Sequence, residues 1–433
     1  MPIKLDINLD SAIRCAIYIM VIALPVSNGL VESSIGFGLF LWLIKHGMMA
    51  KRSLTGGMTL KDQLAVAGQE FRPVHTPVNL LIGSFLSICF LASVFGVQPL
   101  VSIRGFYGKA FEWFVVFFLI LDVFKEKKDI AEGMRILMIV SLVLAVDGLV
   151  QFYWLKRDIL VGRPLTSSGQ VSATFPSANS LGAFLATTIP AAIAYLFFKK
   201  RWRVVLKLAV IIILLWGFIL TLSRGAWLAL VFAVVLAGFA VPVLTVGRMC
   251  SKRIFFLLLT VLIVAGVFVS EFDFAKKHFW EANTGMHRIK MWEDSFKMVH
   301  ERPLLGFGVN TYMRNFQSYR RDHSYFLTYA HNCYVQMLVE IGIMGFTAFL
   351  GLVIIYFKNF LHRLRILYDE DHELFVLGMG IFSGLAAFFM HSFVDVDFYS
   401  LPLARLWWYM MGLGMAVMLI KNDKGGKNKV SGV

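Results

Sequence analysis

Two polar residues, His331 and Asn332, stand directly before a long apolar stretch that carries glycines at positions 342 and 345. An imidazole can accept or donate a proton near neutral pH. Titratable groups buried in lipid are costly, so those that accompany a membrane-spanning helix often mark functional sites. We therefore take His331 as the first candidate for a catalytic or substrate-binding residue, and we expect Asn332 to cap or orient the start of the helix.

Two arginines offer a second kind of chemistry. Arg224 lies in the sequence LTLSRGAWLAL between two apolar stretches, so its guanidinium must lie close to a membrane boundary. Arg288 opens the sequence RIKMWEDSFKMVHERP. A guanidinium presents its donors as a rigid fork that fits phosphate oxygens. These residues could bind a phosphate or pyrophosphate; the alternative is an arginine that only reaches toward lipid headgroups.

Composition places these candidates in an all-α integral membrane protein. Of the 433 residues, 58% are hydrophobic and only 16% are charged. Such a chain cannot cover its surface with polar groups. Apolar runs of about 18 to 25 residues predict roughly twelve membrane-spanning helices, near residues 11–29, 31–48, 78–95, 105–124, 133–155, 178–198, 204–222, 226–243, 253–270, 332–357, 374–394 and 402–420.

The net charge of +15 is distributed by side of the membrane. Basic residues recur in every loop that would face inward if the N-terminus is cytoplasmic, which is the positive-inside pattern, and they include Lys51, Arg52, Lys125, Lys199, Lys200, Arg363, Arg365 and the tail from Lys421. The charge therefore indicates a phospholipid membrane and not nucleic acid as the partner. The exceptions are the arginines on the outer side, which suggest anionic partners there: Arg157, Arg163, Arg224, Arg288, Arg302, Arg314, Arg320 and Arg321.

One long outward loop, about residues 271–330, interrupts the second half of the chain. Within it, an amphipathic helix is predicted from a cap at Asn283 or Thr284 to Pro303, with an apolar face of Ile289, Trp292, Phe296 and Val299. This helix should lie on the membrane face or on the other helices, and it could carry Arg288 toward the same boundary as Arg224. The predicted divisions are residues 1–270 with helices one to nine, 271–330 with the loop, 331–420 with the last three helices, and a basic cytoplasmic tail at 421–433.

Together these segments resemble the O-antigen ligase family, which includes lipopolysaccharide O-antigen ligases and polysaccharide polymerases. The similarity rests on SRG at 223–225, RIKMWEDSFKMVHERPLLGFGVNTY at 288–312, and HN followed by nine residues and Gly342. It extends to FPSANSLGAFL at 175–185 and HSFVDVDFYSLP at 391–402, so it spans roughly residues 150–405. Each motif alone is short, and their common order makes the resemblance specific.

The resemblance implies a GT-C-like, multi-pass glycosyltransferase in the bacterial inner membrane, with its active site facing the periplasm and no cofactor or metal. The donor would be a glycan on undecaprenyl pyrophosphate, and the acceptor a sugar hydroxyl of lipid A-core. By the same resemblance, Arg224 and Arg288 would bind the pyrophosphate, with Arg163 as a further ligand, and His331 would serve the acceptor as a base or act as a phosphate ligand. Asn179 would bind substrate or cap its helix.

Several alternatives stay open. A polysaccharide polymerase would use the same donor and the same chemistry, so the motifs do not separate it from a ligase. Asp395 and Asp397 form a DxD that could hold a divalent cation in a metal-dependent transferase. A lipid-linked glycan flippase also fits about twelve helices, but it predicts repeats and charges near the midplane. The arginines and His331 instead gather on one predicted side, which favours an enzyme.

Overall fold

The computed structural model describes residues 3–54, 58–199, 203–245, 283–321 and 329–420, and helices make up most of them. The first group is α1 (Ile3–Ala23), α2 (Asn28–Ser53), α3 (Leu60–Glu70), α4 (Asn79–Val94), α5 (Pro99–Phe106), η1 (Tyr107–Phe111), α6 (Glu112–Val123), α7 (Lys127–Val150) and η2 (Gln151–Leu155). The second is α8 (Ala178–Phe198), α9 (Val204–Ile219), α10 (Arg224–Thr245), α13 (Asn283–Glu301), α14 (Tyr312–Phe316), α15 (Cys333–Glu370), α16 (His372–His391), η3 (Asp397–Tyr399) and α17 (Leu401–Leu419).

The helices agree with the apolar stretches of the sequence. Every predicted stretch within the described residues overlaps a helix, whereas 253–270 lies outside them. Five helices are long and apolar enough to cross a membrane, and α4 and α9 are shorter apolar helices. The all-helical membrane architecture is therefore confirmed at this level, and the count of about twelve spans stays a prediction. The five are Lys127–Leu155, Ala178–Phe198, Arg224–Val241, Cys333–Glu370 and His372–His391.

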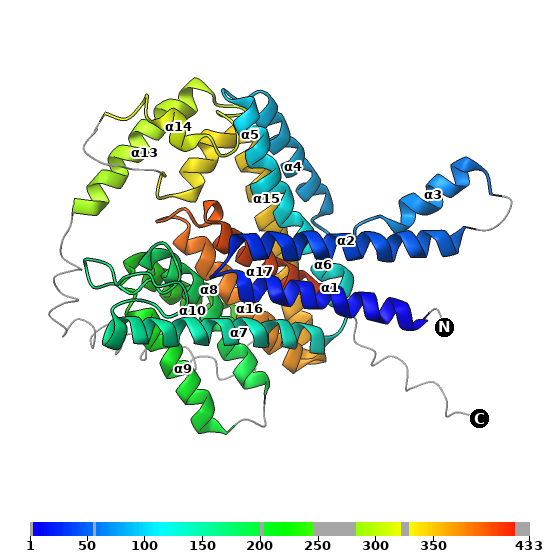
Figure 1. Cartoon of the computed structure of the whole chain (residues 1–433), viewed down its shortest axis with the longest axis horizontal. Coiled ribbons are helices and arrows are strands. Elements are labelled where there is room, and N and C mark those ends of the chain that lie inside the picture. Colours follow the sequence, from blue (N-terminus) through cyan, green and yellow to red (C-terminus); the bar gives the residue numbers. More distant parts are fainter. Residues whose placement is uncertain (1–2, 55–57, 200–202, 246–282, 322–328, 421–433) are drawn as a thin grey trace.

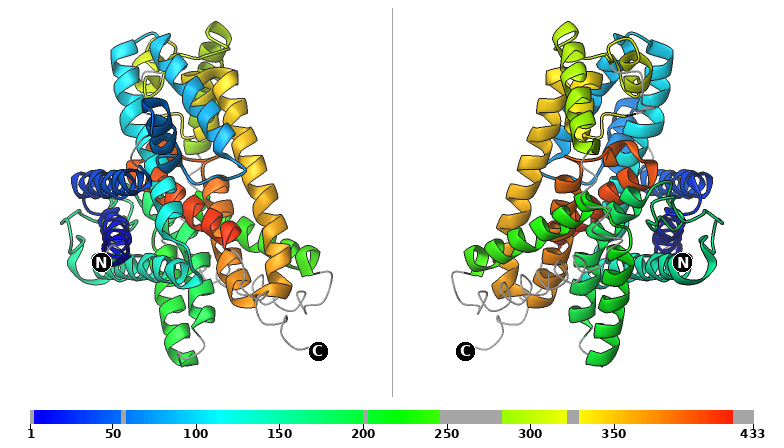
Figure 2. Two further views of the ribbon diagram at one scale, coloured as in Figure 1. Left: turned by 90° about the vertical axis from the view of Figure 1, so that its right-hand side faces the viewer. Right: turned by 90° about the vertical axis from the view of Figure 1, so that its left-hand side faces the viewer.

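Three segments that the sequence predicts to face inward contact one another, at the start of α7, the end of α15 and the end of α17. At the start of α7, the ammonium of Lys127 lies 3.0 Å from Asp371, which joins α15 to α16, and 3.0 Å from Glu373 in the first turn of α16. Nearby, Arg363 donates to the carbonyl of Ile420, just beyond α17. In Figures 1 and 2, α13, α14 and the first part of α15 lie at one end of the molecule beside α4 and α5. These contacts join three segments that are predicted to face inward, and the full order of inward and outward loops stays a prediction.

The amphipathic helix expected in the long loop is present as α13, which starts at Asn283 and ends just before Pro303. Its buried side agrees with the prediction in part, because Trp292 and Val299 pack against the rest of the chain. Met291 and Met298 pack with Phe307 and Tyr312 in a small apolar cluster, whereas Ile289 is 47% and Phe296 is 46% exposed. The sequence alone could not show which of the two apolar rows meets the rest of the chain. The exposed row is the one left to face lipid or solvent.

The longest helix, α15, is broken at Gly342, whose φ of 62° and ψ of −172° are not helical. The segment that follows α13 fills the break. The N–H of Ile343 donates to the carbonyl of Pro303 at 2.8 Å, and the N–H of Phe307 donates to the carbonyl of Val339 at 2.9 Å. A loop backbone and not a second helix therefore occupies the space beside Gly342.

A buried carboxylate completes this junction. Glu340 in α15 is 1% exposed and accepts hydrogen bonds from the N–H groups of Asn310 (2.6 Å) and Tyr312 (3.1 Å). Lys109 in η1 donates to the side-chain oxygen of Asn310 at 2.7 Å. A buried charge is tolerated where several donors satisfy it. The loop between α13 and α15 is thus fixed to α15, which sets Arg288 and His331 in a defined relation to each other.

Candidate active site

The candidate site forms around the turn that follows α16, residues 391–397. Three helices begin beside this turn: α8, α10 and α15. The N–H of Cys333, the first residue of α15, donates to the carbonyl of Ser392 at 2.9 Å. Gly225 places the start of α10 beside the same turn, and Gly182 places the start of α8 against α10. The dipole of a helix places partial positive charge at its N-terminus and attracts anions there, so this convergence favours a negatively charged ligand.

Glycines allow these helix starts to come together. A Cβ atom on Gly225, the second residue of α10, would lie 2.5 Å from Cγ2 of Val394 and 3.5 Å from Nε2 of His391. A Cβ on Gly182 of α8 would lie 2.8 Å from Cβ of Ala226 in α10. Both positions would be overpacked by any larger residue. The glycines of the SRG and SANSLG segments therefore serve the assembly of the site.

His331 lies at the edge of the site, immediately before α15. Its φ of 47° is positive, a conformation that non-glycine residues adopt at a cost and that often marks functional sites. Asn332 caps the helix as predicted, because its side-chain oxygen accepts from the N–H groups of Tyr334 (2.9 Å) and Val335 (3.1 Å). The imidazole Nδ1 of His331 lies 3.3 Å from Oδ1 of Asp395, and 30% of the side chain is exposed.

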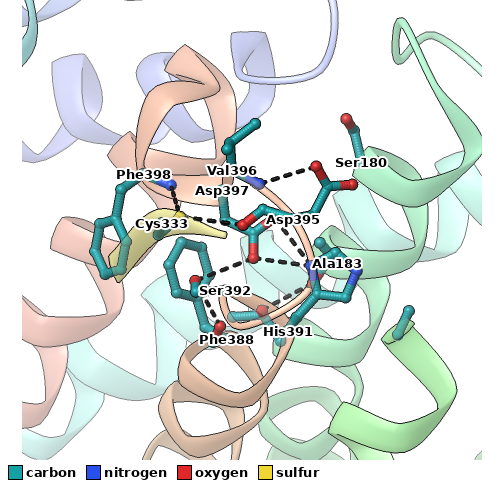
Figure 3. Close-up of polar contacts among 12 residues, drawn as sticks. Ser180, Ala183, Cys333, Phe388, His391, Ser392, Asp395, Val396, Asp397 and Phe398 are labelled. Carbon is teal, nitrogen blue, oxygen red and sulfur yellow. Dashed lines mark hydrogen bonds and ion pairs between the residues drawn. The ribbon is translucent and has the colours of Figure 1, made fainter. Parts of the chain in front are cut away.

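The two aspartates of the DxD serve two different histidines. Asp395 contacts His331 and turns toward Ser180 of α8, whereas Asp397 points inward (Figure 3). Asp397 lies 2.8 Å from Nδ1 of His391 and accepts from the hydroxyl of Ser392 at 3.1 Å. Among the described residues, no group of three or more histidines, cysteines or carboxylates is arranged to hold a metal ion. The geometry pairs each carboxylate with an imidazole.

The pKa values of the two aspartates are shifted in opposite directions. Burial alone would raise the pKa of Asp395, but the hydrogen bond from His331 and the charge of His391 outweigh it and hold the pKa below its usual range. For Asp397, burial dominates and raises the pKa, and the nearby histidine only partly offsets it. Of these two aspartates, Asp395 is thus the one more firmly held in its charged form, and it is also the one that contacts His331.

The two predicted arginines reach the same site from different elements. Arg224 is the first residue of α10, after a turn of only four residues from α9, and it is exposed. Arg288 is half-buried near the start of α13. Burial lowers the pKa of Arg288, the charge of Asp395 raises it, and the charge of Arg224 lowers it. The three charges are therefore close enough to act on one another, although an arginine stays protonated near neutral pH.

Two other predicted residues lie nearby with different roles. Arg163 is exposed in the loop after α7, and its Nε donates to the carbonyl of Thr174 at 2.9 Å. Its loop is tied to the end of α9 by a hydrogen bond from Val171 N–H to the Leu220 carbonyl at 3.1 Å. Asn179 lies in the first turn of α8, but the cap is Ser177, whose hydroxyl accepts from the N–H of Ser180. The prediction that Asn179 caps this helix is wrong, because the helix begins one residue earlier, at Ala178.

His391 was not singled out from the sequence. It is the last residue of α16 and is 1% exposed, so it reads as part of an apolar run. A signal was present, because His391 and Asp397 both lie in the HSFVDVDFYSLP segment, and a histidine six residues before a carboxylate can meet it across a turn. The completed site holds two arginines, two histidines and two aspartates, a set that can bind an anion and move a proton.

Comparison with known proteins agrees with this assembly. Residues 209–350 match the O-Antigen ligase family, and this region contains Arg224, Arg288 and His331. The chain is also 23% identical over 298 residues to a Rickettsia felis protein named "Putative polysaccharide ligase", covering 64% of this chain and 67% of the relative. Part of the chain therefore matches the O-Antigen ligase family, in agreement with the resemblance of its motifs.

Proposed function

We propose that this protein is an O-antigen ligase-type glycosyltransferase that moves a glycan from undecaprenyl pyrophosphate to a sugar hydroxyl of lipid A-core at the periplasmic face of the inner membrane. The observation that carries the proposal is the convergence of two arginines and a histidine–aspartate pair on three helix N-termini. Arg224, Arg288 and His331 lie inside the region that matches the family. A polysaccharide polymerase with the same chemistry is the second candidate.

In this proposal, Arg224 and Arg288 bind the donor pyrophosphate. The bond to the leaving pyrophosphate can break only if its developing negative charge is stabilised, which fixed cations and helix N-termini can do. Arg224 is the first residue of α10, and α8 packs against the start of α10 at Gly182, so the N-termini of these two helices would add to the same field. Arg163, on the loop tied to the end of α9, would contribute a further charge at the rim.

His331 is the proposed base. Asp395 faces Nδ1, so Nε2 is the nitrogen left to receive the proton of the acceptor hydroxyl. As that proton moves to Nε2, the acceptor oxygen forms a bond to the anomeric carbon. The bond from that carbon to the pyrophosphate oxygen breaks, and undecaprenyl pyrophosphate leaves with the electron pair. A single displacement of this kind inverts the anomeric centre, and Asp395 then stabilises the imidazolium.

The arginines provide the test of this proposal. Lysine keeps the charge but loses the fork, so Arg224→Lys and Arg288→Lys should each lower transfer of lipid-linked glycan at least about tenfold, equal to about 1.4 kcal/mol of transition-state stabilisation. The matched control is Arg365→Lys, an exposed arginine of α15 near the opposite end of the bundle. It should retain activity. Near-normal transfer by both site variants at matched expression would remove the pyrophosphate clamp and leave these arginines as headgroup anchors.

A separate observation distinguishes ligase from polymerase. Deletion of a ligase leaves lipid A-core without glycan while lipid-linked polymer still accumulates. Deletion of a polymerase leaves single repeat units on the lipid and on the core. The first pattern supports the proposed activity, and the second assigns the same site to polymer growth.

A further inference from the structure

An exposed apolar loop lies directly after η2, at the outer end of the candidate span Lys127–Leu155. Three consecutive residues form what we call the apolar tip: Ile159 is 59% exposed, Leu160 48% and Val161 46%. The loop projects from the edge of the molecule beyond the end of α7 (Figures 1 and 2). Three adjacent aliphatic side chains facing water would be unfavourable. We therefore expect an apolar environment to cover the tip.

The loop that carries the tip is rigidly built. Asp158 is 1% exposed, and its carboxylate accepts hydrogen bonds from the N–H groups of Val161, Gly162 and Arg163. Asp147, buried in α7, accepts from the N–H of Ile159 at 2.7 Å. Two buried carboxylates therefore fix the backbone on both sides of Leu160. These hydrogen bonds therefore hold the loop in a conformation that exposes the apolar tip.

The residues around the tip are those typical of a membrane boundary. Tyr153 and Trp154, which end the candidate span, are 48% and 69% exposed, and aromatic rings of this kind concentrate at the level of lipid headgroups. Exposed Lys156, Arg157 and Arg163 flank the tip. Cationic side chains beside an apolar surface suit the phosphates of a lipid bilayer. A second copy of the chain would be expected to match the apolar residues but gives no reason for the cations.

We propose that Ile159, Leu160 and Val161 insert into the outer leaflet of the bilayer, with Lys156, Arg157 and Arg163 at the level of its phosphates. The loop would then hold the outer end of α7 and the turn between α9 and α10 at a fixed depth. That turn precedes Arg224, and it is linked to the loop through the hydrogen bond between Val171 and Leu220. The insertion itself does not depend on the proposed enzymatic activity.

The experiment uses the full-length protein in vesicles of phosphatidylcholine and phosphatidylglycerol. A polarity-sensitive nitrobenzoxadiazole label is attached to Leu160→Cys, with Cys15 and Cys250 replaced by serine. Cys89 and Cys333 are buried and out of reach of the label. The matched control is Ser168→Cys, an exposed polar position a few residues further along the same loop. Quenching by doxyl-labelled phosphatidylcholine reports direct contact with lipid chains.

The proposal predicts blue-shifted emission at position 160 and quenching by doxyl lipid several-fold stronger than at position 168. Emission typical of water at position 160, without quenching, would overturn it. Blue-shifted emission without quenching by lipid would also overturn it, because protein and not lipid would then cover the tip. A failure of the glycan-transfer assay leaves this result unaffected, since the label is read without substrate. Leu160 is exposed, so replacing it removes no core contact.

Discussion

Gly342→Ala offers the sharpest test of how the loop after α13 is held against α15. The backbone at Gly342 adopts φ 62° and ψ −172°, a region open almost only to glycine. An added Cβ would collide with the carbonyl group of Leu304 and would lie 2.7 Å from the nitrogen of Leu305. These neighbours are backbone atoms, so no side chain can rotate away to relieve the clash.

The expected cost has two parts. The unfavourable backbone conformation contributes about 1 to 3 kcal/mol. If the loop shifts to admit the methyl group, it loses the hydrogen bonds from Ile343 N–H to Pro303 and from Met344 N–H to Leu304, at about 1 kcal/mol each. The sum is about 3 to 5 kcal/mol of folding stability. The same shift moves the loop that links Arg288 to His331, so transfer activity should fall together with stability.

Gly351→Ala is the matched control in the same helix. A Cβ there would find only Cδ2 of Leu81, at 3.9 Å, and the backbone of Gly351 is helical. Alanine at such a position should be neutral or stabilising by up to about 1 kcal/mol. The thermal unfolding midpoint is measured in detergent by fluorescence-detected size-exclusion chromatography. Glycan transfer is assayed on the same variants. A Gly342→Ala protein with the midpoint and activity of Gly351→Ala would refute the view that a loop backbone fills the break in α15.

Three further predictions concern the histidine–aspartate pair. His331→Ala should remain folded and inserted, because the residue lies at the partly exposed helix start, but transfer should fall about a hundredfold or more; a well-expressed variant with normal transfer would contradict the role of base. The pKa of Asp395 lies below its usual range, so its stabilising charge is present above about pH 4 and is lost only as the pH falls further. Asp395→Asn should therefore lower the unfolding midpoint at pH 5, and the difference should shrink as the pH falls below about 4; a variant with the wild-type midpoint at pH 5 would show that the charged carboxylate does not stabilise the fold. Purified protein should stay active in chelator; activity abolished by EDTA and restored by magnesium or manganese would instead favour a metal held by Asp395 and Asp397.

Much of the helical framework could be predicted from the sequence. Long apolar runs must form helices in lipid, since every backbone polar group has to be paired within the segment, and the helices overlap those runs wherever the chain is described. The end of α13 just before Pro303 followed from a local signal, since proline stops a helix. The cap at Asn332 followed from its position before an apolar stretch. These features depend on neighbours within a few residues along the chain.

The features that escaped prediction depend on distant parts of the chain. The backbone of Gly342 is set by Leu304 and Leu305, which approach it from the preceding loop. The choice between two apolar rows on α13 was decided by Tyr312 and Phe316, whose positions no periodicity within α13 could reveal. The partner of His331 is Asp395, more than sixty residues away. A sequence shows which residue types are present, but such pairings emerge only when separate helices are packed together.

The shared use of Asp395 links the two halves of the proposed reaction. In the structure this carboxylate offsets the charge of Arg288 and also contacts His331. A pyrophosphate that binds Arg224 and Arg288 would supply its own negative charge to the guanidinium groups. We infer that Asp395 would then be free to stabilise the imidazolium that forms as His331 takes the acceptor proton. Donor binding would in this way prepare the base, and an Asp395→Asn enzyme should lose kcat more than donor affinity.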